Sequence, residues 1–155
     1  MKIFSVLLLC LFLSDHTFAQ SQIASCHDPK GYAFFPFIDP VPKSKSGWTD
    51  DAITGGVATL TKIGKGDYDL LFVDSTKRVI SSKQDGGLVR LIRANQKEIA
   101  VLVLYPNIVE VYTFWKTNDG QLQYSIIQSK GADNPIYKTS EMVGKCDFIN
   151  FNAIN

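Results

Sequence analysis

Residues 98–129 read EIAVLVLYPNIVEVYTFWKTNDGQLQYSIIQS, and this stretch decides the fold class. It contains three runs rich in β-branched and aromatic residues, at 98–105, 108–116 and 121–129, separated by a Pro-Asn pair and an Asn-Asp-Gly triplet. Short apolar runs bounded by turn residues are typical of antiparallel strands joined by tight hairpins. The stretch therefore predicts a three-stranded antiparallel meander.

The loops also predict which residues face each other. Asn-Asp-Gly suits a three-residue loop with Gly in the left-handed position, which pairs Thr117 with Gln121. The two-residue Pro-Asn loop pairs Tyr105 with Ile108. Counting back from both loops gives further opposite pairs: Phe114 with Tyr124, Tyr112 with Ile126, Glu110 with Gln128, and Val103 with Glu110.

These pairs sort the meander into an inner and an outer face, because successive side chains of a strand point in opposite directions. The inner face is apolar and aromatic and is expected to form the core or the lumen: Ile99, Val101, Val103, Tyr105, Ile108, Tyr112, Phe114, Leu122, Tyr124 and Ile126. The outer face combines polar residues with apolar ones: Gln121, Gln123 and Ser125 with Leu102, Leu104, Val109 and Val111. We expect the aromatic N-terminal segment or a partner chain to cover its apolar part.

The rest of the chain continues the pattern of short strands separated by turns. Further strands are expected at 57–63, 67–74, 88–93 and 139–148. Roughly seven or eight strands, with no helical periodicity longer than one turn, predict an all-β domain. We favour an antiparallel meander that closes into a small up-and-down, lipocalin-like barrel, because closure removes exposed edges. A two-sheet sandwich is the alternative.

The N-terminal part of the domain has a different composition. Residues 25–45 contain four prolines, a density that disfavours a helix or a central strand: Pro29, Pro36, Pro40 and Pro42. Residues 20–47 are therefore expected to form an extended arm that ends in an exposed tip at 43–47. Its aromatic residues are expected to pack as core under a loop rather than to form a recognition surface: Tyr32, Phe34, Phe35 and Phe37.

Acidic residues follow the arm and recur further along the chain. Residues 49–53 are expected to form one helical turn capped by Thr49, with Trp48 packed against it. Asp67 and Asp69 lie two positions apart and are read as a solvated strand start rather than as metal ligands. The sequence therefore predicts no metal site.

The beginning of the chain has the pattern of a secretory signal peptide. Lys2 precedes an apolar stretch at 3–13, and a short polar segment ends in Thr17-Phe18-Ala19. Small residues thus occupy the two positions that a signal peptidase recognises. The apolar stretch is shorter than the about 20 residues that a transmembrane helix needs. We therefore expect removal of residues 1–19, a single domain at 20–155, and export to the periplasm or the extracellular space.

Removal of the signal peptide takes Cys10 away and leaves Cys26 and Cys146. In an exported chain such a pair most simply forms a disulfide, which would clasp the first and last elements of the domain. An alternative is that residues 23–26, Ile-Ala-Ser-Cys, form a lipobox that makes Cys26 a lipid anchor. Polar residues separate that motif from the apolar stretch, so the disulfide is favoured.

Charge and residue inventory exclude several functions. Sixteen Lys+Arg against fifteen Asp+Glu give a net charge of +1, without the basic surface expected of a nucleic-acid-binding protein. After removal of the signal peptide only one histidine remains, His27, and zinc-protease, nucleophile-elbow, phosphate-loop and dinucleotide motifs do not occur. We expect no cofactor, and a binding protein rather than an enzyme.

Glu110 is the candidate site residue, because the register places its carboxylate among apolar and aromatic side chains. A buried carboxylate is costly unless it is protonated or paired, so we expect one of these, with Arg90 or Arg93 as the partner. It serves either as part of a structural pair, as an edge position that reaches water, or as the polar anchor of a mostly apolar ligand pocket. In the last case the ligand-binding residues are Glu110, Tyr112, Tyr124 and Tyr105.

Five segments are spread over most of the domain: Trp48-Thr49-Asp50-Asp51, Gly55-Gly56, Tyr68-Asp69-Leu70-Leu71-Phe72-Val73-Asp74, Tyr105-Pro106 and Glu110-Val111-Tyr112-Thr113-Phe114. In these segments and their spacing the chain resembles small exported bacterial proteins of unassigned function. The resemblance implies a periplasmic or secreted setting and brings no catalytic residues.

Together these features predict an exported, non-enzymatic protein that binds a small, partly apolar ligand. The alternative is a protein-interaction or inhibitor module that acts through the arm at 20–47 and the outer sheet face. A hydrolase that uses carboxylates ranks third.

Overall fold

The computed structural model describes residues 20–73, 76–131 and 134–154. Within these ranges the chain forms a ten-stranded antiparallel sheet and two short 3-10 turns, which confirms the all-β class. The strands are β1 (Ser21–Phe35), β2 (Gly47–Ala52), β3 (Val57–Gly64), β4 (Asp67–Val73), β5 (Val79–Ser81), β6 (Leu88–Ala94), β7 (Glu98–Leu104), β8 (Ile108–Lys116), β9 (Leu122–Lys130) and β10 (Lys138–Ile149). The 3-10 turns are η1 (Lys43–Lys45) and η2 (Phe151–Ile154).

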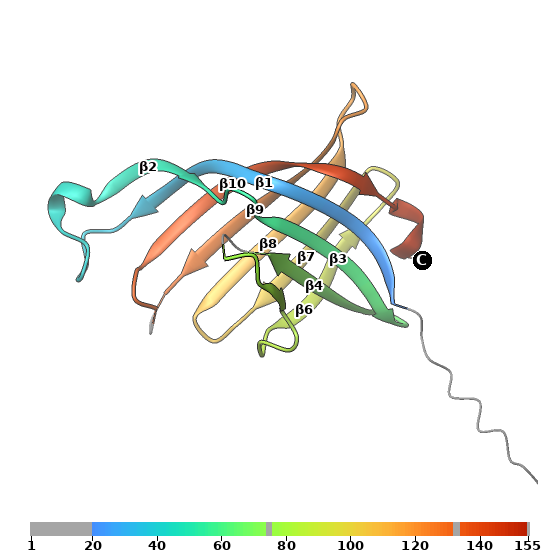
Figure 1. The fold of residues 1–155 in the computed structure, drawn as a ribbon, viewed down its shortest axis with the longest axis horizontal. Coiled ribbons are helices and arrows are strands. Elements are labelled where there is room, and N and C mark those ends of the chain that lie inside the picture. Colours follow the sequence, from blue (N-terminus) through green and yellow to red (C-terminus); the bar gives the residue numbers. More distant parts are fainter. Residues whose placement is uncertain (1–19, 74–75, 132–133, 155) are drawn as a thin grey trace, which may run out of the picture.

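The sheet has the strand order of an up-and-down barrel. The order is β5-β4-β3-β1-β10-β9-β8-β7-β6, and β2 pairs with β1 next to β3. The sheet curls into a half-barrel, with β1 and β10 side by side in its wall (Figure 1). The strands β5 and β6 end the sheet, and no ladder joins these two among the described residues. The antiparallel meander is therefore confirmed, and the barrel stays open along this seam.

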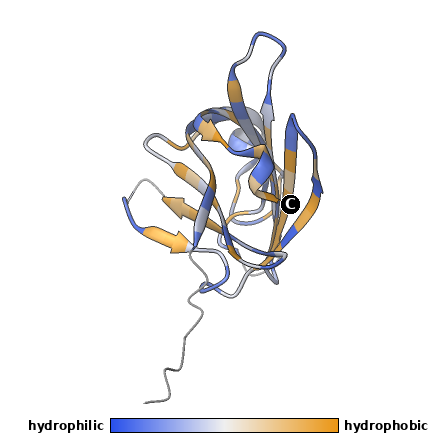
Figure 2. Cartoon of the chain, turned by 90° about the vertical axis from the view of Figure 1, so that its right-hand side faces the viewer, coloured by the Kyte–Doolittle hydropathy of each residue, from blue (hydrophilic) through white to orange (hydrophobic). Residues whose placement is uncertain are grey.

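The register predicted for the central meander is confirmed. The strand pairings oppose Phe114 to Tyr124, Tyr112 to Ile126, Glu110 to Gln128, and Val103 to Glu110. Most of the predicted inner face forms the core together with buried residues of β1, β3 and β4, such as Ile23, Leu60 and Leu70. Ile108 and Leu122 are half-buried and lie outside this core cluster. Figure 2 shows apolar residues recurring along the strands and a hydrophilic hairpin loop projecting at the top.

The N-terminal segment is a central strand, so the expectation of a separate arm is wrong. One edge of β1 pairs with β10, and the other pairs with β3 at residues 21–27 and with β2 at 30–35. Pro29 lies at the break in register between these two halves, where the ladder needs no N–H. The other three prolines lie in the loop at 36–46. A long strand can therefore carry a proline where its ladder is interrupted.

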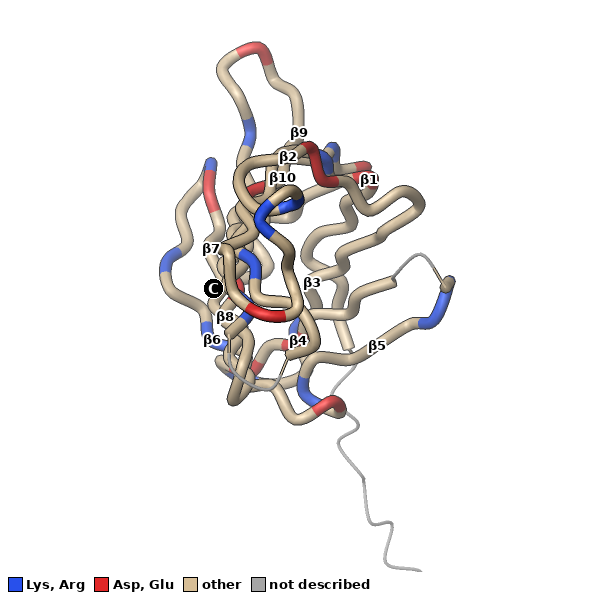
Figure 3. Tube along the Cα trace, turned by 90° about the vertical axis from the view of Figure 1, so that its left-hand side faces the viewer, with Lys and Arg blue, Asp and Glu red and all other residues tan. Residues whose placement is uncertain are grey.

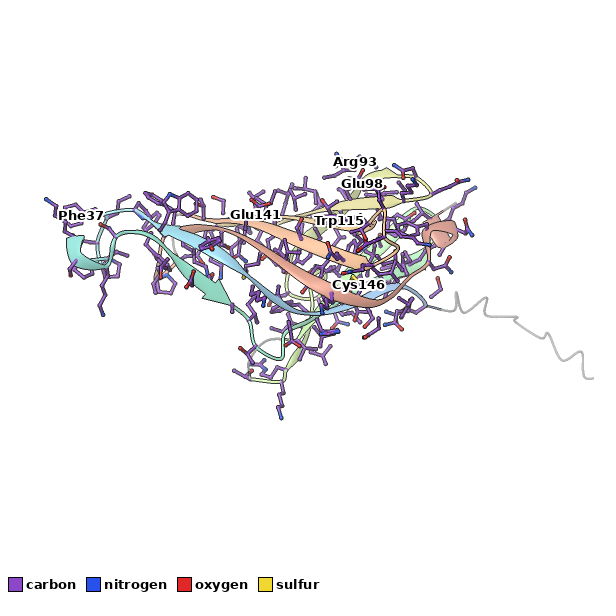
Figure 4. The ribbon with its side chains drawn as sticks, turned by 90° about the horizontal axis from the view of Figure 1, so that it is seen from above. Phe37, Arg93, Glu98, Trp115, Glu141 and Cys146 are labelled. Atoms are coloured by element: carbon purple, nitrogen blue, oxygen red, sulfur yellow. A yellow bond between two sulfur atoms is a disulfide. The ribbon has the colours of Figure 1, made fainter. Side chains whose placement is uncertain are left out.

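The helical turn expected at 49–53 is also wrong, because β2 forms a hairpin with the end of β1. Trp48 pairs with Phe34, and Asp50 pairs with Tyr32. This ladder satisfies backbone groups that a single helical turn would leave without partners. The hairpin projects from the half-barrel in Figure 1, and Figure 4 shows Phe37 at its tip.

The aromatic side chains of this hairpin do not pack as core. The exposed fraction is 72% for Trp48 and 61% for Tyr32, and Phe37 is exposed as well. The expectation that they fill space under a loop, and that Trp48 packs on a turn, is therefore wrong. The exposed tip at 43–47 is found, with η1 at its start.

The short strand β5 was not predicted, because three residues carry too little periodicity. It buries Asp69, whose carboxylate accepts hydrogen bonds from the Ser81 hydroxyl at 2.5 Å and from the backbone N–H of Lys83 at 3.1 Å. Asp67 is exposed and pairs with the Lys83 ammonium at 2.7 Å. The prediction of a solvated carboxylate at the strand start is therefore confirmed for Asp67. It is wrong for Asp69, which is buried.

Cys26 and Cys146 lie opposite each other on β1 and β10 and form a disulfide. The two residues are 120 positions apart, so the bond clasps the first and last strands of the sheet, as expected (Figure 4). A disulfide-bonded Cys26 is not free for lipid attachment, which removes the lipobox alternative. The expected signal peptide, with Cys10, lies outside the described residues.

Replacing both cysteines by alanine is expected to lower the free energy of unfolding by roughly 4–5 kcal/mol, the loop-closure entropy of a chain segment this long. Urea unfolding of the oxidised protein and of the double variant measures the difference. Unfolding of the oxidised protein with and without reductant is the control. A loss below about 1 kcal/mol would contradict the prediction, because the disulfide would then not restrict the conformations of the unfolded chain appreciably.

Candidate functional site

A cavity of about 830 Å³ opens at one end of the half-barrel. The β7–β8 and β9–β10 connections lie at this end, because antiparallel strands turn back alternately at the two ends of a sheet. The lining includes Asp51, Phe72, Ile80, Tyr105, Ile108, Glu110, Tyr112, Ile126, Gln128, Lys130, Lys138 and Met142. Three of the four predicted ligand-binding residues are therefore brought together in one cavity.

Three rows of inner side chains cross β10, β9 and β8 at the cavity, and all their members except the buried Ser140 line it. Strand pairing aligns an apolar row (Met142, Ile126, Tyr112), a polar row (Ser140, Gln128, Glu110) and a lysine row (Lys138, Lys130, Ile108). The apolar row is buried and the lysine row is partly exposed. Because side chains on one face repeat about every 6–7 Å along a strand, the wall changes step by step from apolar to cationic.

Glu110 is held by two hydrogen-bond donors within the cavity wall. The Tyr112 hydroxyl donates to one carboxylate oxygen at 2.9 Å, and the Gln128 amide donates to the other. The partners expected from the sequence are wrong: Arg93 pairs with Glu98 at 2.5 Å, and Arg90 pairs in register with Leu102, on the outer face. A carboxylate fixed in this way is a preorganised acceptor.

Two tyrosines frame the carboxylate. Burial raises the pKa of Tyr112 well above its usual value, and the negative charge of Glu110 acts in the same direction. Burial also raises the pKa of Tyr105. The Tyr105 ring lies against Gly87, where an added Cβ would come within 2.8 Å of a ring carbon. Both hydroxyls therefore stay protonated at neutral pH and can donate hydrogen bonds.

Tyr124 is a core residue and does not line the cavity. Its ring stacks on Phe114 with centroids 6.0 Å apart, and it is fully buried. Gly144 makes room for it, since a Cβ there would lie 2.4 Å from the Tyr124 ring. The Tyr124 hydroxyl has no hydrogen-bond partner among the described residues. Burial raises its pKa, and nothing in the structure brings it to Glu110.

The lysine row was missed by the sequence analysis. Lys138 pairs with Asp51 of β2 at 2.6 Å, and both side chains are largely buried. Burial and the neighbouring Lys138 lower the pKa of Lys130, while Glu110 and Asp51 oppose that shift. One of the two lysines could have been located from the sequence. Extending the Glu110–Gln128 pairing by two residues places Lys130 opposite Ile108.

A second surface lies on the outer face of the sheet. Tyr32, Phe34 and Trp48 form an outer aromatic patch, in which the Phe34 and Trp48 rings are 5.4 Å apart. On the opposite face of β1, Gly31 and Ala33 are small and Phe35 is half-buried. Tyr32 and Phe34 thus expose large apolar side chains on the outer face, which is ordinarily the polar face of an antiparallel sheet.

The apolar residues on the outer face of the meander are only partly covered. The N-terminal segment is in the sheet itself and does not lie across it. Val109 and Ile127 are exposed, while Leu102, Leu104 and Val111 are half-buried. The register places Glu141 and Thr139 of β10 between these residues and the outer aromatic patch, so the two apolar areas are separate.

Charged residues of both signs alternate along the chain trace in Figure 3 and do not gather in one region. Among the described residues no group of three or more His, Cys, Asp or Glu side chains is arranged to hold a metal ion. No helix in the described ranges is long and apolar enough to cross a membrane. The cavity and the outer aromatic patch are thus the two surfaces that call for an explanation.

Tyr112→Phe is expected to lower the free energy of unfolding by about 1–2 kcal/mol, because it removes a hydrogen bond to a carboxylate in a buried setting. Tyr124→Phe is the matched control, since its hydroxyl has no partner among the described residues, and its unfolding free energy should be unchanged or slightly higher. Urea unfolding measures both variants. Equal losses in the two would contradict the assigned hydrogen bond.

Comparisons with protein-family models, curated protein sequences and solved structures give no match for this chain. The resemblance to small exported bacterial proteins therefore stays a prediction. Any function has to be inferred from the geometry of the cavity and of the outer aromatic patch.

Proposed function

We propose that the protein binds a small amphipathic molecule in the cavity of the half-barrel and does not convert it. The observation that carries this proposal is the order of the three rows, from apolar through hydrogen-bonding to cationic. Small-molecule pockets typically occupy about 300–1,000 Å³ and combine apolar walls with a few fixed polar groups. The cavity, at about 830 Å³, falls in that range.

The polar row supports recognition rather than reaction. Glu110 already accepts two hydrogen bonds, so its position is fixed before a ligand arrives. Fixing the polar groups in advance lowers the entropy that binding must overcome. The phenol of Tyr105 and the amide of Gln128 add donors on the same wall.

The proposal includes export of the protein. The predicted signal peptide at 1–19 would direct the chain out of the cytoplasm, into the periplasm or the extracellular space. The disulfide between Cys26 and Cys146 fits this setting, because structural disulfides persist in oxidising compartments.

Filling the open end of the cavity should abolish binding. Ile108→Trp places an indole in the lining, and we expect loss of binding of the neutral fluorescent probe N-phenyl-1-naphthylamine. Val109→Trp is the matched control, because the neighbouring side chain points to the outer face and is exposed. Fluorescence titration measures probe affinity, and circular dichroism checks the fold.

If the native protein and the Val109→Trp variant both fail to enhance probe fluorescence, the proposed function is wrong. Equal binding by both tryptophan variants would also contradict it, because the probe would then lie outside the cavity.

A second candidate function is that of a protein-interaction module, favoured by the outward-facing aromatic residues Tyr32 and Trp48. Exposed patches of this kind often mark interaction surfaces, and Tyr and Trp are enriched among residues that dominate binding energy. We propose that a partner protein docks on the outer aromatic patch.

Replacing Tyr32 and Trp48 together by serine should abolish binding of the partner protein. The free energy of unfolding should stay nearly unchanged, because both side chains are exposed in the free protein. Affinity capture from an extract of the producing organism, compared between the native protein and this double variant, measures the effect. Recovery of the same proteins on both would contradict the candidate.

A further inference from the structure

Two lysines oppose each other across neighbouring strands at the mouth of the cavity. Lys130 of β9 and Lys138 of β10 are a register pair, and both line the cavity. Like charges directly opposite on one face of a sheet are destabilising. Both residues are only partly exposed, and the Lys138 ammonium is bound to Asp51. The pair therefore concentrates positive charge where the cavity opens.

One of the two lysines forms a direct ion pair with a carboxylate of the described residues. Asp51 binds Lys138 at 2.6 Å. Among the described residues no carboxylate lies within 4.0 Å of the Lys130 ammonium. Glu110, in the neighbouring polar row, is held by Tyr112 and Gln128. Asp85 and Glu110 also line the cavity, and Lys130 is thus the lining ammonium group without a carboxylate at ion-pair distance among the described residues.

The polar row adds one constraint on the group that could pair with Lys130. The Glu110 carboxylate, which lines the cavity next to the lysine row, repels an anionic group that moves deeper, so an anion is held at the lysine row. Ser140 of the same row is buried and does not line the cavity, so it offers no contact to such a group.

We propose that the ligand of the cavity is an amphipathic monocarboxylate, with its carboxylate at Lys130 and its apolar body along the apolar row. The assignment rests on the proposed small-molecule binding function and names its ligand class. One carboxylate suffices to pair with the Lys130 ammonium, whereas a dianion would bring a second negative charge toward Glu110 and Asp85, which also line the cavity. The apolar body then contacts Met142 and Ile126, deeper in the cavity.

Two ligands that differ only in the head group test the proposal: dodecanoate and methyl dodecanoate. Displacement of N-phenyl-1-naphthylamine gives both affinities. We expect dodecanoate to bind at least about tenfold more tightly, the effect of one charge-assisted contact. Lys130→Gln should remove this preference and leave the affinity for the ester unchanged, and Lys130→Arg should restore it. Lys145→Gln, on the outer face of β10, is the matched control and should change neither affinity.

The outcomes separate the ligand class from the function. Equal affinities for acid and ester, unaffected by Lys130→Gln, overturn the carboxylate assignment while the cavity still binds amphiphiles. Binding of the neutral probe without displacement by either ligand overturns the assignment as well. If neither the probe nor either ligand binds, the proposed function and the assignment both fail.

Discussion

The pairing of β1 with β10 is the contact on which the rest of the structure depends. These two strands join β3–β5 on one side to β6–β9 on the other, and no other ladder among the described residues connects the two groups. The Cys26–Cys146 disulfide lies within this pairing and holds it covalently. The cavity also depends on it, because its rows begin on β10 and Asp51 reaches Lys138 only from β2, which is held by β1.

Strands whose pairing partners lie nearby in the sequence could be predicted, and strands whose partners lie far away could not. Hairpins at 98–129 carry their register in their own loops, so Glu110 and Gln128 were placed correctly. The environment of β1 is set by residues far away in the sequence, and four prolines nearby suggested a loose segment. Only the strand pairing reveals that Pro29 lies at a break in the ladder. β2 was misread for the same reason, since its partner ladder lies on β1.

The same distinction applies to the candidate site. Tyr105, Glu110 and Tyr112 belong to one predicted meander and line one cavity. Tyr124 shares their face, but alternation alone does not say how deep along the strand a side chain lies. The lysine row needed the β9–β10 register and the position of β2, both of which bring in residues outside that meander. Local pattern thus located the wall of the cavity, and long-range pairing determined its charge.

The place of β1 also affects how the chain reaches its fold. Strands β6 to β10 follow one another, so they can add hairpin by hairpin as the chain is made, whereas β1 is made first and its partner β10 last. At a synthesis rate of about 5–20 residues per second, the 120 residues between the two cysteines take on the order of ten seconds. During that interval β1, with its apolar residues and a reduced Cys26, has no final partner on that edge. The unpaired edge of β1 is therefore a place where aggregation can begin before the sheet is complete.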